Sequence, residues 1–161
     1  MRPTRFTWRA ALCWYLQAIL PAVGVSSASA ETGYAAWLRY APIEAAQKER
    51  YNAVPRRLLL LGDSSVLKTA RDETIRGLTS MLGEPIVPLT DRGSGSIIVM
   101  GTLDRVRALI DDPDLPTQLR ADGFWLGRAV MKQGPALVIA GQSDRGVLYG
   151  AFALLRHRYV A

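Results

Sequence analysis

Apolar positions along the chain change their period several times, and each change predicts a different structural element. A continuous apolar run at residues 57–61 is bounded by a proline and a glycine, which is typical of a buried strand. From residue 66 to 82 the apolar side chains instead recur at helical spacing, and Gly83 supplies a stop signal. A second apolar run at 97–100 lies between glycines and predicts the next strand.

The second half of the chain predicts a further helix, a hairpin and a closing helix. Thr102 is a candidate N-cap for a helix that carries Val106, Leu109 and Ile110. Two strands at residues 124–131 and 136–140 are separated by a Lys-Gln-Gly-Pro turn, which predicts a hairpin, and a last helix is expected over about 144–157.

The order of these elements predicts the fold class. Strand–helix–strand connections place the early strands parallel, whereas the hairpin adds an antiparallel pair. We therefore expect an α/β (α+β) two-layer sandwich, in which a mixed sheet of about four strands carries the two long helices on one face.

The segment at residues 31–52 predicts short helical pieces that Pro42 interrupts. Thr32 is a candidate N-cap, and an aromatic cluster around Trp37 falls at helical spacing. Aromatic clusters also form platforms for sugars, but packing is the favoured interpretation here, so Trp37 is assigned a structural role. Residues 43–52 are expected to add a helical turn or two.

Charge separates the first thirty residues from the rest of the chain. Three of the 20 basic residues lie there without any acidic residue, so residues 31–161 carry 17 basic and 14 acidic side chains. This mild excess, without a basic stripe interleaved with aromatics, argues against a nucleic-acid partner.

The same first thirty residues have the order of a secretory signal peptide. A basic stretch precedes an apolar run at 10–25, and small residues follow at Ala28 and Ala30. The alternative is a membrane anchor, but an apolar run of about sixteen residues is short for crossing a bilayer. We therefore expect a signal peptide over 1–30, export to the periplasm or the extracellular space, no membrane attachment after cleavage, and a mature domain at 31–161.

Gly62-Asp63-Ser64, directly after the first predicted strand, resembles the opening block of GDSL-type esterases. A nucleophilic serine needs a histidine base, which in turn needs an orienting carboxylate. The only histidine, His157, has Leu154 three residues earlier, where those enzymes have an aspartate. We favour Ser64 as the N-cap of the following helix and keep the esterase as an alternative.

Other local patterns predict neither a cofactor nor a metal. The glycines of Gly93–Ser96 precede a strand, whereas phosphate-binding loops follow one, and Gly101-Thr102 is better explained by capping. Three aspartates within 111–114 lack a calcium-loop pattern and are typical of a solvated turn. The only cysteine, Cys13, lies within the predicted signal peptide.

The closing helix carries two glycines, Gly146 and Gly150, four residues apart on one face. A missing Cβ at both positions lets a helix approach a sheet closely. We therefore assign structural roles to Gly146, Gly150 and the neighbouring Tyr149, and we name no catalytic residue.

Four stretches of the chain are similar to the N-terminal domain of family 67 glycoside hydrolases, the α-glucuronidases of xylan breakdown. They are residues 33–40, 70–83, 95–102 and 137–156. The last stretch, which contains Tyr149-Gly150, also resembles the small α/β domain that precedes the barrel in β-hexosaminidases. The resemblance implies a fold like that domain.

The resemblance also implies a function. It is that of an accessory domain of an exported α-glucuronidase, which removes (4-O-methyl)glucuronic acid from xylooligosaccharides. The catalytic carboxylates lie in a (β/α)₈ barrel beyond the last helix, so we expect this chain to lack the barrel and to be inactive alone. Glucuronoxylan-derived oligosaccharides are then partners through the barrel, to which this domain docks. The alternative is a stand-alone carbohydrate-binding or interaction module, which needs an exposed aromatic groove.

Overall fold

The computed structural model describes residues 40–157, apart from 45, 47 and 48. These residues belong to one compact unit, Leu38–Ala161. The predictions for the signal peptide, Thr32 and Trp37 lie outside the described residues. Among the described residues of 43–52, a 3₁₀ turn, η1 (Glu49–Tyr51), corresponds to the helical turn or two that are expected.

A five-stranded mixed sheet forms the centre of the domain. In chain order its strands are β1 (Arg57–Leu61), β2 (Val87–Leu89), β3 (Ile97–Thr102), β4 (Phe124–Met131) and β5 (Gly134–Gly141). Their spatial order is β2-β1-β3-β5-β4. All neighbours are parallel except the β4–β5 hairpin, which is antiparallel. The predicted mixed sheet and hairpin are therefore confirmed.

Strand β2 is the one strand that the sequence pattern does not predict. It has only three residues, lies at an edge of the sheet, and has Pro88 at its centre opposite Leu58. Proline donates no hydrogen bond to a ladder and is confined to edge strands, so the apolar pattern is too short and too interrupted to be recognised. With β2 the sheet has five strands, one more than the four expected from the sequence.

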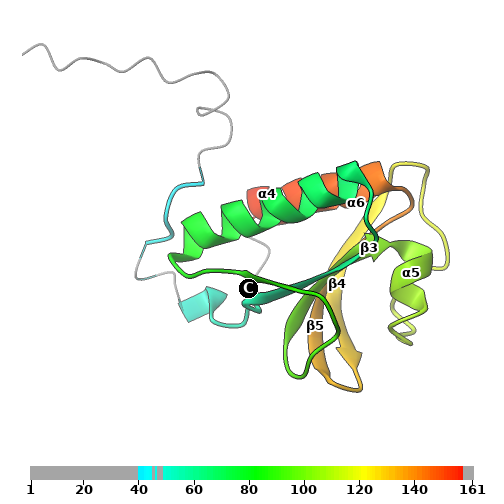
Figure 1. Ribbon diagram of the computed structural model, residues 1–161, viewed down its shortest axis with the longest axis horizontal. Coiled ribbons are helices and arrows are strands. Elements are labelled where there is room, and N and C mark those ends of the chain that lie inside the picture. The colour runs from blue at the N-terminus through cyan, green and yellow to red at the C-terminus, as the bar shows by residue number, and fades with distance from the viewer. Residues whose placement is uncertain (1–39, 45, 47–48, 158–161) are drawn as a thin grey trace, which may run out of the picture. The chain divides into compact units, whose positions relative to one another are not determined.

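Two long helices, α4 (Ser65–Leu82) and α6 (Asp144–His157), lie side by side on one face of the sheet (Figure 1). Helix α4 ends at Gly83, whose backbone is left-handed with φ 73° and whose N–H donates to the Thr79 carbonyl. The predicted stop is thus confirmed. None of the described helices is long and apolar enough to cross a membrane.

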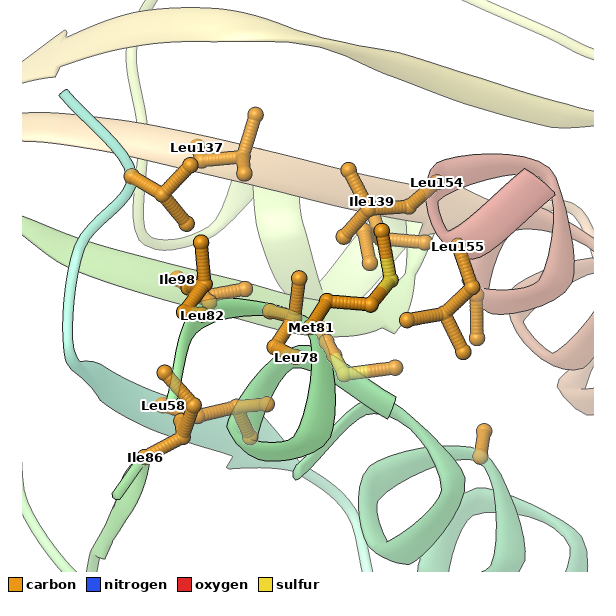
Figure 2. Close-up of a cluster of buried hydrophobic side chains, with 14 of the residues drawn as sticks. Leu58, Leu78, Met81, Leu82, Ile86, Ile98, Leu137, Ile139, Leu154 and Leu155 are labelled. Atoms are coloured by element: carbon orange, nitrogen blue, oxygen red, sulfur yellow. The ribbon is translucent and has the colours of Figure 1, made fainter. Parts of the chain in front are cut away.

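A hydrophobic cluster joins these helices to the sheet (Figure 2). Strands β1, β3 and β5 contribute Leu58, Ile98 and Ile139, which are completely buried. The helices contribute Leu78 from α4 and Leu154 from α6 to the same cluster. The two-layer arrangement predicted from the order of elements is therefore present.

A second cluster covers the opposite face of the sheet. It joins Leu59 and Val99 of the strands to Leu103 and Val106 of a short helix, α5 (Leu103–Arg107). Strands buried on both faces read as continuous apolar runs, which explains the patterns of β1 and β3.

Helix α5 is shorter than its apolar pattern predicts. Leu109 and Ile110 lie beyond its end, although the Ile110 N–H still donates to the Val106 carbonyl at 2.8 Å. One further helical turn of hydrogen bonding therefore keeps both side chains on the packed side.

Residues 90–96 cross the same face as α5. They connect the carboxyl end of β2 to the amino end of β3, which lie on either side of β1. The guanidinium of Arg57 supports this connection, because it lies beside Gly93 and donates a hydrogen bond to the Ser94 carbonyl. Since alternate residues of a strand share a face, Arg57 and Leu59 both lie beneath the crossing segment.

Candidate functional site

The structure separates the serine and the histidine of the esterase alternative. The Oγ of Ser64 accepts a hydrogen bond from the Leu67 N–H at 3.2 Å, which is the predicted N-cap. Helices α4 and α6 both follow parallel strands and begin at the same edge of the sheet. His157 is the last residue of the 14-residue α6, so about 20 Å of helix separates it from that edge. The two residues therefore do not form a catalytic pair.

The two glycine amides of the loop before β3 are not free to bind a phosphate. The Gly93 N–H donates to Oδ1 of Asp91 at 3.1 Å, and the Gly95 N–H donates to the Gln133 carbonyl at 2.9 Å. The Arg57 guanidinium occupies the space beside both glycines. These contacts shape and hold the loop between β2 and β3.

The aspartates at residues 111–114 form a local turn. The Asp112 carboxylate accepts a hydrogen bond from the Asp114 N–H at 2.9 Å. In the part of the chain that the structure describes, no three His, Cys, Asp or Glu residues are placed to hold a metal ion. Thr102 lies at the N-cap of α5, but its hydroxyl makes no capping hydrogen bond.

The two glycines of α6 lie where the helix meets the sheet. A Cβ on Gly146 would be 2.5 Å from the Gly123 carbonyl oxygen. A Cβ on Gly150 would be 2.7 Å from Cγ2 of Ile139 and 3.3 Å from Cβ of Phe124. The helix therefore lies against β5 and the start of β4 at a separation that leaves no room for these atoms.

Two tyrosines from the sequence analysis, Tyr149 and Tyr40, lie at different helices. Tyr149 is 47% exposed on α6, next to the buried Gly150. The N-terminal aromatic cluster around Trp37 consists of Tyr34, Trp37 and Tyr40, and of these three the structure describes Tyr40. Its hydroxyl contacts Oε2 of Glu73 at 3.4 Å, and the Arg76 guanidinium lies 5.6 Å from its ring centroid. Tyr40 is thus held on the surface of α4.

A groove that the sequence pattern does not reveal lies at the carboxyl end of β1. It is a shallow hollow of about 860 Å³, wide open to solvent, between the crossing segment 90–96 and α5. Leu59 and Leu61 of β1 line it, and Arg92 and Arg105 come from the two sides. The Arg105 guanidinium reaches across to β1, because a Cβ on Gly62 would lie 2.9 Å from its Nη1 atom. We call this the arginine groove.

The charges of the arginine groove are unbalanced. Among the described residues, neither Arg92 nor Arg105 has a hydrogen-bond or ion-pair partner. Asp91 also lines the groove, and one of its carboxylate oxygens already accepts the Gly93 N–H. No sequence motif indicates this site, because its two arginines are thirteen positions apart and lie in the 90–96 segment and in α5.

Comparison with known proteins identifies the fold as that of a described family. Residues 36–154 match the family model described as Glycosyl hydrolase family 67 N-terminus. The chain belongs to this family. The resemblance inferred from the four sequence stretches is therefore confirmed, and the five-stranded sheet with α4 and α6 is the structure of a family 67 N-terminal domain in this chain.

The relatives of this family 67 domain include fungal proteins named as α-glucuronidases. Alpha-glucuronidase A of Aspergillus tubingensis is 38% identical over 135 residues, covering 81% of this chain and 15% of that protein. The probable α-glucuronidase A of Aspergillus oryzae is 37% identical over 134 residues, with the same two shares. The probable α-glucuronidase A of Aspergillus niger is 36% identical over 141 residues, which cover 85% of this chain and 16% of that protein. The chain thus spans about 15% of the length of these relatives.

Proposed function

We propose that the chain is the accessory N-terminal domain of an exported α-glucuronidase, which removes (4-O-methyl)glucuronic acid from xylooligosaccharides. The observation that carries the proposal is the family 67 match over residues 36–154. Identities of 37–38% to proteins named α-glucuronidase A support it. Because the matched part is about 15% of those proteins, we assign hydrolysis to a (β/α)₈ barrel outside this domain and place this domain against that barrel.

The ion pairs of two described glutamates fit a non-catalytic role. Inverting glycoside hydrolysis needs two carboxyl groups about 6.5–9.5 Å apart that face a bound sugar. Here Glu73 forms an ion pair with Arg76 at 2.6 Å, and Glu84 forms one with Arg56 at 2.7 Å. These two carboxylates are therefore already paired with arginines at the surface of the domain.

A domain-replacement experiment tests the proposal. We expect the purified chain alone to release no sugar acid from aldouronic acids, which are short xylooligosaccharides bearing 4-O-methylglucuronate. We expect a chimaera in which residues 36–154 replace the matching segment of the Aspergillus tubingensis enzyme to release it. The readout is chromatography of the sugar acid, and the enzyme with that segment deleted is the control.

Two results would contradict the accessory role. One is hydrolysis by the chain alone that scales with its concentration. The other is a chimaera that melts cooperatively like the parent enzyme but has no activity, because a domain that folds and still fails to support the barrel does not have the proposed role.

Export is part of the proposal and has its own test. We propose that residues 1–30 are removed and that the mature chain begins at Glu31, because small residues at Ala28 and Ala30 follow the apolar run. N-terminal sequencing of the protein recovered from the periplasm or medium of a Gram-negative host should read Glu-Thr-Gly. Mature protein that retains Arg2 would overturn the prediction.

A further inference from the structure

The arginine groove lies near the point where the connections after β1 and β3 leave the sheet on opposite faces. Strands β1 and β3 are parallel neighbours, but α4 follows β1 on one face and α5 follows β3 on the other. Open α/β sheets bind ligands outside the carboxyl ends of their strands at such points. Leu61 and Gly62, at the carboxyl end of β1, line the groove on the α5 side.

Three kinds of surface meet in the groove. Leu59 and Leu61 supply apolar area, and Arg92 and Arg105 supply guanidinium donors without partners among the described residues. Asp91 supplies an acceptor, since a carboxylate has about four lone-pair sites and only one of its oxygens receives the Gly93 N–H. A matching ligand therefore carries one anionic group, at least one hydroxyl donor and an apolar face.

We propose that the arginine groove binds a sugar acid. The carboxylate of the ligand accepts hydrogen bonds from Arg92 and Arg105, because guanidinium–carboxylate contacts are among the strongest hydrogen bonds in proteins. A ring hydroxyl donates to Asp91, and the C–H face of the ring covers the leucine side chains. The inference goes beyond the proposed function, because it concerns binding by residues of this domain alone.

Other small ligands match the groove less well. A neutral sugar leaves both guanidinium groups without an anionic partner. Acetate and inorganic phosphate satisfy the arginines but leave the leucine surface and Asp91 without contacts. Comparing these probes therefore separates recognition of a sugar acid from simple attraction of an anion.

The test is a titration of the purified, isotopically labelled protein, followed by amide chemical shifts. We expect glucuronic acid to move the amides of Gly62, Gly93 and Arg105 with a dissociation constant of about 1 mM. Glucose and acetate should bind at least about tenfold more weakly. Affinity should also fall as salt is added, because both arginines are exposed.

Three variants complete the test. Arg92→Gln and Arg105→Gln should each weaken glucuronic acid binding about tenfold, which is the loss of a charge-assisted hydrogen bond. Arg71→Gln is the matched control, because Arg71 pairs with the adjacent Asp72 on α4. Unchanged amide spectra away from the groove show that each variant is folded.

Several results would overturn the inference. If glucuronic acid causes no amide chemical-shift changes at concentrations well above the expected dissociation constant, the groove does not bind it. Equal affinity for phosphate or acetate means that the arginines attract any anion. An equal loss of affinity in Arg71→Gln means that the effect is one of overall charge. None of these results affects the domain-replacement experiment, so failure here is distinct from failure of the proposed function.

Discussion

Replacement of Ile98 by alanine should lower the free energy of unfolding by about 2–5 kcal/mol. Ile98 is completely buried near the start of β3, where it pairs with Leu58 of β1 and Leu137 of β5. Figure 2 shows Leu82 of α4 beside it on the helix-covered face of the sheet. The deletion removes apolar contacts and leaves a cavity that rigid neighbours on three sides cannot fill. Urea denaturation followed by circular dichroism measures the change.

Val130→Ala is the matched control for this prediction. Val130 is also a β-branched residue in a strand, but it is 76% exposed on β4, at the edge of the sheet. Surface substitutions of this kind change stability by about 0.5 kcal/mol or less. If Ile98→Ala costs no more than Val130→Ala, then the cluster between the sheet and the two long helices does not determine the stability of the domain.

The elements with strong local signals could be predicted from sequence almost to the residue. Helix α6 covers Asp144–His157 and β4 covers Phe124–Met131, as expected, because a helical period and a hairpin turn define them locally. The bounds of α4 follow from Ser64 and Gly83, whose capping chemistry depends on neighbouring residues alone.

The features that depend on distant contacts could not be predicted in this way. Strand β2 exists because a three-residue segment pairs with β1, and its proline hides any strand pattern. The arginine groove needs Arg92, Arg105 and β1 to meet, and nothing in the local sequence of any of them indicates the other two. Sequence patterns therefore do not indicate this site, whereas three of the stretches that indicate the family include strand β3 and most of helices α4 and α6.

Gly150→Leu should destabilise the domain by about 1–3 kcal/mol, because it overpacks the contact between α6 and the sheet. Even the Cβ of the new side chain would lie 2.7 Å from Cγ2 of Ile139, which is completely buried in the middle of β5. Leucine favours a helix over glycine by about 1 kcal/mol, so the intrinsic preference alone predicts stabilisation. A loss of stability therefore indicates that packing dominates, whereas a gain indicates that helix propensity dominates. Differential scanning calorimetry of the original and the Gly150→Leu proteins measures the change.

A double-variant cycle gives the sharper form of this test. Ile139→Ala removes the side chain that the new residue would meet, so the cost of Gly150→Leu should fall in that background by about 0.5–3 kcal/mol. Tyr149→Leu is the control on the neighbouring, 47% exposed position, and its cost should be the same in both backgrounds because it faces away from Ile139. A Gly150→Leu protein with an unchanged or raised melting temperature, and no coupling to Ile139, would mean that α6 does not press its glycine face onto β5. The close contact of α6 would then be confined to Gly146, where an added Cβ would lie 2.5 Å from the Gly123 carbonyl oxygen, a backbone atom with no side chain to move aside.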